Sequence, residues 1–397
     1  MKNVKMLLIF MITSTLLLAS AQRVNSLGGN VGYWADDDNS WTAFPHTLNN
    51  SNLAQVSGIG SDGNHNAIVR WGDGTKWGFS WNQANANDMI NLQWGSGSMG
   101  ATFGLAMSAA DDGDDANGKA TSGMGISASW GMKMGFGEVG VGFSTSSNDD
   151  GMDATKNDPS TMGFSANIRR AQSLWIFDNM LVGFNYGTSN AGMGYGNSED
   201  CATDDCYDVA YTMGYENAVT TMALSTSLYS HIDISDNTTG LIAMGFSYSS
   251  QTGYIMDATA PVAAIADNEY TAEDETVDAV AYVAGMDLKD YAGSVIALPT
   301  WTFAVESAMT DWATARVGVN AGYNLMATAN SGVTGAKDVT GRGGMETAFS
   351  VGLGFNYGSF NLDVDVSEGL FTNPVQHVTG FESIAPTGAT ATLTYAW

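Results

Sequence analysis

The residues able to do covalent chemistry are few and scattered along the chain. Histidine, the usual general base, occurs four times, at His46, His65, His231 and His377. None of them has the spacing typical of a nucleophile triad or a zinc site. Glycine strings such as Gly352-Leu353-Gly354 lack the following Lys-Ser/Thr of a phosphate loop, and are interpreted as strand glycines. The sequence therefore predicts no enzyme, no cofactor and no metal site.

Cys201 and Cys206 are the only cysteines, five positions apart in an acidic segment. Two cysteines without a neighbouring histidine make a poor zinc site. In an oxidising compartment we expect them to form a local disulfide.

Carboxylates gather in four segments that are poor in apolar residues. Such clusters could hold calcium, but none has the full twelve-residue calcium loop, and charge runs usually form a solvated surface. A surface that binds a partner is a further alternative. The clusters are Asp111, Asp112, Asp114 and Asp115; Asp149, Asp150 and Asp153; Glu199, Asp200, Asp204 and Asp205; and Glu273, Asp274 and Glu275.

Seven charged side chains alternate with apolar residues, which places them on a polar face. Lining a pore, they would tune its selectivity, and the carboxylates would favour cations. The same groups could instead pair with one another, or with Arg169 and Arg170, inside a plugged barrel. Both interpretations stay open. The seven candidates are Arg70, Lys76, Glu138, Glu306, Arg316, Asp363 and Asp365.

The N-terminus has the layout of a secretory signal peptide. Lys2 and Lys5 precede an apolar run over 6–18, and Ala19-Ser20-Ala21 follows as a cleavage site. The run is too short for a spanning helix. We expect cleavage after Ala21.

The remaining 376 residues carry 12 basic and 41 acidic side chains, which argues against nucleic acid as a partner. No later segment offers about 18 consecutive apolar residues, so a membrane-embedded chain must cross with strands. Glycine and aromatic residues are abundant, and charged residues are only 14%. This composition is typical of a barrel in which apolar and polar residues alternate.

Period-two alternation is the strongest signal in the chain. In the segment 389–397, Leu393, Tyr395 and Trp397 share one face and threonines share the other. The segments 349–357, 360–367 and 138–144 alternate in the same way. In 66–82, Asp73-Gly74 separates two alternating runs and predicts a tight hairpin.

Long and short connections also alternate. Long acidic or glycine-rich segments fall near 110–120, 147–160, 189–207, 251–292, 326–343 and 368–387, and short ones near 132–135, 172–174, 234–238, 309–311 and 357–359. Counting through the N-terminal hairpins predicts an all-β, up-and-down antiparallel transmembrane barrel of about sixteen strands. Fourteen strands is the alternative if the first hairpin belongs to a plug. A soluble β-sandwich would show more regular spacing.

The last strand resembles the C-terminal signature of bacterial outer-membrane barrels. That resemblance implies that the barrel-assembly machinery reads Leu393, Tyr395 and Trp397, although Trp397 replaces the more usual phenylalanine. Trp397 and Tyr395 could equally belong to the interfacial aromatic girdle.

Leu27-Gly28-Gly29, Asp36-Asp37-Asp38 and Phe44-Pro45 resemble the opening of long-chain fatty-acid transporter-like barrels. The resemblance covers about thirty residues, and the family's Asn-Pro-Ala element appears only as Phe44-Pro45-His46. It implies a small plug before the first strand and transport of apolar molecules.

The sequence thus predicts a signal peptide over 1–21, a periplasmic segment or plug over 22–51 and an outer-membrane barrel over 52–397. The predicted function is passive diffusion of small polar or cationic solutes through a porin-like channel. The alternatives are a plugged carrier of hydrophobic compounds, with an apolar pocket beneath the plug, and a display or adhesion scaffold. Expected partners are lipid, the assembly machinery and small solutes, with a homotrimer possible.

Overall fold

The computed structural model describes residues 20–60, 65–82, 88–110, 121–149, 160–190, 195–200, 207–212, 218–254, 291–330, 339–341, 344–366 and 389–397. Residues 1–19 of the predicted signal peptide, the predicted disulfide cysteines and most of the acidic segments lie outside these residues, whereas Ser20 and Ala21, the last two residues of that predicted peptide, lie within them.

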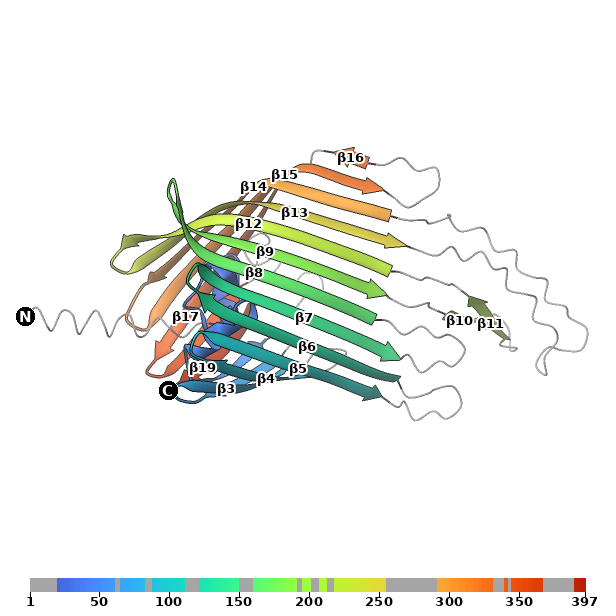
Figure 1. Cartoon of the computed structure of the whole chain (residues 1–397), viewed down its shortest axis with the longest axis horizontal. Coiled ribbons are helices and arrows are strands. Elements are labelled where there is room, and N and C mark those ends of the chain that lie inside the picture. Colours follow the sequence, from blue (N-terminus) through green and yellow to red (C-terminus); the bar gives the residue numbers. More distant parts are fainter. Residues whose placement is uncertain are drawn as a thin grey trace, which may run out of the picture.

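The described residues form a closed barrel of sixteen antiparallel strands, which confirms the predicted fold class (Figure 1). Each strand pairs with its neighbours along the chain, and the sheet closes where β1 pairs with β19. A three-residue strand, β16 (Val339–Gly341), adds to β15, and β10 (Tyr195–Asp200) and β11 (Tyr207–Thr212) form a separate hairpin. The barrel strands are β1 (Leu53–Ile59), β2 (Asn66–Trp71), β3 (Thr75–Asn82), β4 (Asp88–Ser96), β5 (Met99–Ala110), β6 (Thr121–Met134), β7 (Gly137–Asp149), β8 (Ser160–Leu174), β9 (Phe177–Asn190), β12 (Ala218–Ser235), β13 (Thr238–Tyr254), β14 (Tyr291–Ala308), β15 (Ala313–Asn330), β17 (Met345–Tyr357), β18 (Phe360–Val366) and β19 (Ala389–Ala396).

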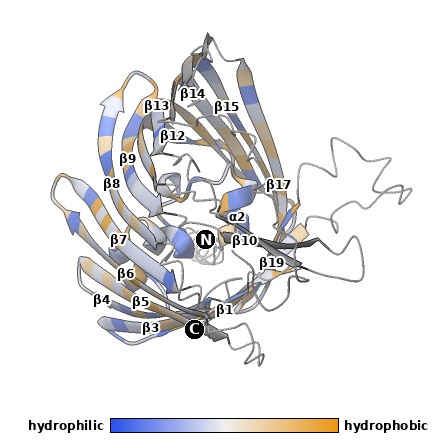
Figure 2. Cartoon of the chain, turned by 90° about the vertical axis from the view of Figure 1, so that its right-hand side faces the viewer, coloured by the Kyte–Doolittle hydropathy of each residue, from blue (hydrophilic) through white to orange (hydrophobic). Residues whose placement is uncertain are grey.

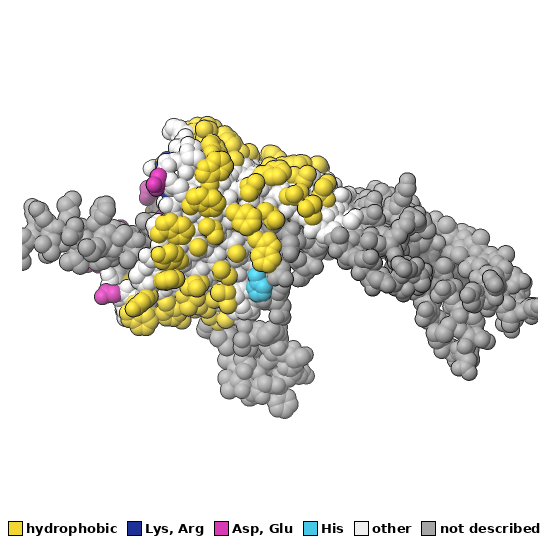
Figure 3. Space-filling model, turned by 90° about the horizontal axis from the view of Figure 1, so that it is seen from below, with side chains coloured by type: hydrophobic (Ala, Val, Ile, Leu, Met, Phe, Trp, Pro, Cys, Tyr) yellow, Lys and Arg dark blue, Asp and Glu magenta, His cyan; other side chains and the backbone are white. Residues whose placement is uncertain are grey.

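The predicted alternation separates an apolar outside from a polar inside. On β2 and β3, Val69 and Trp77 are 42% and 54% exposed on the outer face, while Arg70 points inward and is 1% exposed. On β19, Leu393 is exposed and Thr394 is fully buried. On the side of the barrel seen in Figure 3, apolar side chains spread over the outer surface and the few charged ones lie at one end. Lipid rejects charge, so this surface suits a bilayer.

The predicted hairpins are also confirmed. Asp73-Gly74 joins β2 to β3, and Gly74 adopts φ +77°, a conformation that glycine reaches without strain. Two-residue connections at 135–136, 175–176, 236–237 and 358–359, and a four-residue connection at 309–312, lie within a few residues of their predicted positions. These turns share one end of the barrel with the C-terminus (Figure 1), and we call it the turn end.

Residues 20–50 lie inside the barrel, and we call them the plug segment. They form α2 (Ala21–Ser26) and three 3₁₀ turns, η1 (Val31–Tyr33), η2 (Asp38–Thr42) and η3 (Pro45–Asn49). Looking down the barrel, Figure 2 shows α2 within the ring of strands. No helix in the described part of the chain is long and apolar enough to cross a membrane.

Inward-facing glycines make room for the plug segment. A β-carbon built at Gly140 would lie 1.9 Å from the Ala43 carbonyl oxygen, and one at Gly318 would lie 2.4 Å from the Gly28 nitrogen. Gly352, interpreted above as a strand glycine, leaves space for Ser26 in the same way. Any larger residue at these positions would collide with the plug backbone or side chains.

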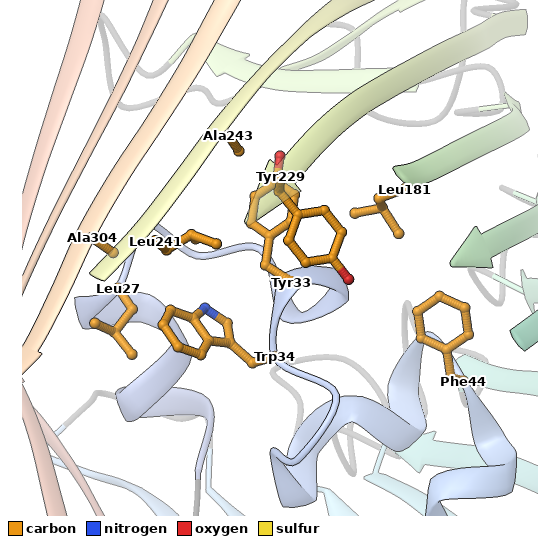
Figure 4. Close-up of a cluster of buried hydrophobic side chains, with 9 residues drawn as sticks. All are labelled: Leu27, Tyr33, Trp34, Phe44, Leu181, Tyr229, Leu241, Ala243 and Ala304. Carbon is orange, nitrogen blue, oxygen red and sulfur yellow. The ribbon is translucent and has the colours of Figure 1, made fainter. Parts of the chain in front are cut away.

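An apolar cluster packs the plug segment against the wall, as Figure 4 shows. Tyr33 and Tyr229 have ring centroids 5.0 Å apart, and Leu27 is 1% exposed. Burial of these side chains favours the docked segment. The cluster comprises Leu27, Tyr33, Trp34 and Phe44 from the plug and Leu181, Tyr229, Leu241, Ala243 and Ala304 from the wall.

Candidate transport site inside the barrel

A chain of buried ion pairs joins the plug segment to the barrel wall. Arg23 of α2 donates from Nε and Nη2 to the two carboxylate oxygens of Glu306 on β14, at 2.9 and 2.8 Å. Arg316 on β15 donates to Glu306 at 2.7 Å and to Asp363 on β18 at 2.6 Å. Bidentate guanidinium–carboxylate pairs are among the stronger hydrogen-bonded contacts, and this one fixes the position of α2.

Asp363 extends this network to Ser20, which precedes the predicted cleavage site and would be absent from the cleaved protein. Its Oδ2 accepts hydrogen bonds from Asn361 Nδ2 at 2.7 Å and from Ser20 Oγ at 2.8 Å. The side chain of Ser20 also accepts from the Arg23 backbone N–H, which caps α2. Glu306, Arg316 and Asp363, predicted as separate lumen candidates, therefore form one cluster.

Within the plug segment, Arg23 also holds Asp37. Arg23 Nη1 lies 3.0 Å from Asp37 Oδ2, and the Asn39 backbone N–H donates to Asp37 Oδ1 at 2.8 Å. Burial raises the pKa of Asp37 to about 7, and the Arg23 guanidinium opposes that rise. Although burial alone would lower it, the pKa of Arg23 stands well above its ordinary value because Glu306 and the neighbouring aspartates stabilise its charge.

A second ion-pair cluster holds the other half of the plug segment. Glu138 on β7 pairs with Arg169 on β8 at 2.5 Å, and its other oxygen lies 3.5 Å from His46 Nε2. Arg169 donates to the Gly32 carbonyl oxygen at 3.0 Å, and its guanidinium lies 4.4 Å from the Phe44 ring centroid. Both η1 and η3 are thus fixed by one guanidinium–carboxylate pair.

Neutral side chains complete the contact between plug and wall. Asn320 on β15 donates to the Gly28 carbonyl oxygen at 2.6 Å. Asn49 at the end of η3 donates to the Met99 carbonyl oxygen at 2.9 Å. Gln22 bonds to Thr390 and Thr392 of β19. The plug therefore contacts strands on several sides of the barrel.

The other predicted lumen residues lie apart from these two clusters. The Arg70 Nε atom lies 3.4 Å from Gln93 Oε1 on the inner wall. Lys76 donates to Asn52 Oδ1 at 2.6 Å, just after the plug segment. Asp365 accepts from Thr390 Oγ1. A role for all seven residues in ion selectivity stays a prediction.

Sequence reasoning did not single out Arg23, Asp37 or His46 as partners of the lumen charges. The full sequence has only 14 basic residues, so an arginine two positions after the predicted cleavage site was the available signal. Arg169, named as one possible partner, does pair with Glu138. Arg170 instead bonds to Gln172.

A cavity of about 470 Å³ lies between the tip of η2 and the wall from β4 to β12. Its lining residues Gly142 and Ser144 follow Gly140 along β7, on the side away from the turn end. Trp41 and Thr42 line it from the plug segment. No group of three or more His, Cys, Asp or Glu side chains placed to hold a metal ion occurs within the described ranges.

Comparisons with known proteins find no family model and no curated protein that matches the sequence. Among solved structures, the Pseudomonas putida toluene transporter TodX is 8% identical, with 96% of this chain and 97% of that chain covered and a TM-score of 0.40. The siderophore receptor PiuA from Acinetobacter baumannii is 8% identical over 80% of this chain and 56% of its own, also at 0.40. The ferric-catecholate receptor Fiu from E. coli is 10% identical over 80% and 54%, at 0.40.

The chain spans just over half the length of the two receptors. These likenesses concern the barrel fold and transfer no substrate. The sixteen-strand closure, the apolar outer surface and the polar inner face stand independently of them. The fold is a closed antiparallel β-barrel with an apolar outer face and a polar inner face.

Proposed function

We propose that this barrel passes small polar solutes across the outer membrane and that the plug segment gates its lumen. The bidentate contact between Arg23 and Glu306 carries the proposal, because it ties a segment inside the barrel to the wall through groups that can exchange partners. A buried ion pair contributes little net stability once desolvation is counted, so such an anchor is compatible with release. No covalent step is involved.

We keep passive diffusion as the proposed mode of transport and change the predicted basis of its cation preference. Cation preference was expected from carboxylates facing an open lumen, and Glu306 and Asp363 instead each bond to a guanidinium in the docked state. Passage then requires the plug segment to shift, and only afterwards would these carboxylates face a solute. Selectivity for cations remains a prediction about that released state.

The alternative function, a plugged carrier of hydrophobic compounds, also requires a plug but predicts an apolar pocket beneath it. The apolar side chains of the plug, such as Leu27 and Phe44, pack directly against wall residues. The cavity next to Trp41 is bordered mainly by hydroxyl, amide and glycine residues. Polar solutes therefore fit the described interior better.

A reversible cross-link between plug and wall tests the gate. A β-carbon built at Gly32 would lie 2.5 and 2.8 Å from the two methyl carbons of Leu181. The two positions are therefore in direct contact, and we expect cysteines placed there to form a disulfide. The pair Gly32→Cys and Leu181→Cys is made in a chain with Cys201→Ser and Cys206→Ser. The readout is swelling of proteoliposomes in glycerol, with folding checked by heat-modifiable gel mobility.

We expect proteoliposomes with the reduced protein to swell in glycerol. Those with the oxidised protein should swell at least about tenfold more slowly, because the disulfide holds the plug segment docked and lowers the population of open barrels. Equal swelling in both redox states would contradict gating by the plug segment. An absence of swelling by the folded, reduced protein would overturn the transport function itself. The cysteine-free parent, treated with the same oxidant, is the matched control.

A further inference from the structure

The cavity beside Trp41 has a wall built from short polar side chains and glycines. Its polar lining side chains come from seven barrel strands and lie on their inner faces: Asn91, Thr102, Ser127, Ser129, Ser144, Ser165, Asn185 and Thr221. Phe143 and Phe164 border it through their backbones, because their side chains are 45% and 43% exposed on the outer face. Hydroxyl and amide groups can both donate and accept hydrogen bonds.

Glycines keep this cavity open and bring the polar groups to its surface. A β-carbon built at Gly142 would lie 2.7 Å from Ser165 Oγ, and one at Gly163 would lie 2.8 Å from Ser144 Oγ. Each serine therefore leans over a glycine of the neighbouring strand. With no larger inward side chain at these positions, a volume of about 470 Å³ remains, within the range of small-molecule sites.

Among the described residues that line the cavity, none is charged. A charged solute taken out of water here would lack an ionic partner and would carry a large desolvation cost. A neutral solute with many hydroxyl groups would exchange its hydrogen bonds with water for bonds to the wall. The lining thus favours a neutral, polyhydroxylated compound over an amino acid or an organic ion.

Trp41 adds an aromatic surface to this polar wall. It stands at the end of η2, lines the cavity and is only partly buried, although large aromatic side chains gain most from full burial. An indole face packs well against the C–H face of a sugar ring, and the hydroxyl groups at the ring edge are then free to bond to the wall. Trp41 belongs to the plug segment, so a bound solute would touch the gate.

We propose that this cavity is a binding site for a neutral mono- or disaccharide, with Trp41 as the stacking surface and the serine, threonine and asparagine side chains as hydrogen-bond partners. The inference rests on the proposed function in naming the solute class that the barrel would pass. Binding itself does not require that the gate open.

The test is calorimetric titration of the folded full-length protein in detergent with glucose and maltose, and with gluconate and lysine as charged comparators. Trp41→Ala removes the stacking surface and Trp41→Phe keeps an aromatic ring. Gly163→Val fills the cavity. Gly183→Val is its matched control, because a β-carbon there meets Ser225 Oγ at 2.9 Å and Gly183 does not line the cavity.

We expect saturable binding of a sugar, weakened about tenfold in Trp41→Ala and less in Trp41→Phe, as loss of an aromatic contact predicts. Gly163→Val should abolish binding and Gly183→Val should leave it unchanged. Absence of sugar binding by the folded parent, tighter binding of gluconate or lysine, or equal affinity in Gly163→Val would overturn the site. Redox-controlled glycerol swelling without sugar binding would defeat this inference alone, and sugar binding without swelling would defeat only the transport function.

Discussion

Arg23 and Glu306 lie 283 positions apart in the chain and meet through two hydrogen bonds of 2.9 and 2.8 Å inside the barrel. Both side chains are almost completely buried, at 3% and 8% exposure. Arg23 also has its guanidinium 5.1 Å from the Trp34 ring centroid. This contact links the plug segment to β14 and, through Arg316, to β15 and β18.

Replacing Glu306 with glutamine should loosen this anchor. Loss of one partner from a buried ion pair leaves the other charge uncompensated, and we expect the free energy of unfolding to fall by about 3 kcal/mol. The value is at the low end of the usual range because Arg23 still pairs with Asp37 and Arg316 still pairs with Asp363. Urea unfolding of the refolded barrel measures it. Glu346→Gln, at an exposed glutamate that accepts from Asn324, is the matched control and should change little.

Plug docking should weaken as pH rises, through Asp37. Its pKa is about 7 in the docked segment against an ordinary 3.8, so the docked form holds its proton more tightly than a released segment would. The contribution is full below about pH 4 and is lost as pH rises through about 7. Arg23, Asp36 and Asp38 are the charged groups that act on Asp37.

The urea midpoint of the parent, followed from pH 4 to 8, should therefore fall more steeply than that of Asp37→Asn. The difference between the two proteins isolates Asp37 from other titrating groups. Asp236→Asn, in the exposed β12–β13 turn, should retain the parental slope. Identical slopes for the parent and Asp37→Asn would contradict the assignment.

A side chain at Gly140 should push the plug segment away from the wall. The Gly140→Val β-carbon would lie 1.9 Å from the Ala43 carbonyl oxygen, a backbone atom that cannot rotate aside. We expect larger or more frequent conductance steps than in the parent, measured in a planar bilayer with a potassium chloride gradient. The β-carbon of Gly183→Val would meet only side-chain atoms, Ser225 Oγ at 2.9 Å and Asn167 Oδ1 at 3.4 Å, and this variant should conduct like the parent.

If Gly140→Val fails to fold, Gly131→Val serves instead, because its β-carbon would meet Pro45 at 2.7 Å. Parental conductance in a folded variant of either kind would show that the docked plug does not obstruct the lumen. The ion preference of the open state would also test the predicted role of Glu306 and Asp363.

Deletion of Trp397 should lower the yield of assembled barrel in cells severalfold. Leu393, Tyr395 and Trp397 project from the outer face, at 41%, 39% and 55% exposure, and the resemblance to barrel-assembly signals places recognition on these side chains. Heat-modifiable gel mobility of membrane fractions measures the assembled share. Trp77→Ala, at an outer-face tryptophan of 54% exposure, controls for loss of one lipid-facing aromatic. Equal yields for both variants would contradict a special role of Trp397 in barrel assembly.

The fold was predictable because its signals are local. Alternation along β2, β3 and β19 repeats every two residues, and a turn such as Asp73-Gly74 depends on the conformations available to its own residues. The even strand count followed from the alternation of short and long connections. The same patterns predicted an inner face for Arg70, Glu138 and Asp363; in the structure Arg70 and Asp363 are buried and Glu138 pairs with Arg169.

The partners of those inner charges were not predictable in the same way. Alternation gives the face of Glu306 but says nothing about which group from the N-terminal segment lies opposite it. From the sequence alone, the glycines of β7 and β8 are interpreted as ordinary strand glycines. The cavity becomes apparent only when strand pairing places Gly142 beside Ser165 and Gly163 beside Ser144.

The sequence by itself thus determined an antiparallel barrel of about sixteen strands and the inward or outward face of side chains in its alternating segments, because these depend on interactions between near neighbours in the chain and on the contrast between lipid and water. The tertiary structure alone decided how residues 20–50 pack within the lumen, that Arg23 meets Glu306 and that Trp41 faces a hydroxyl-lined cavity. Those outcomes depend on closure of the sheet, which brings strands and segments hundreds of residues apart to within a few ångströms of one another.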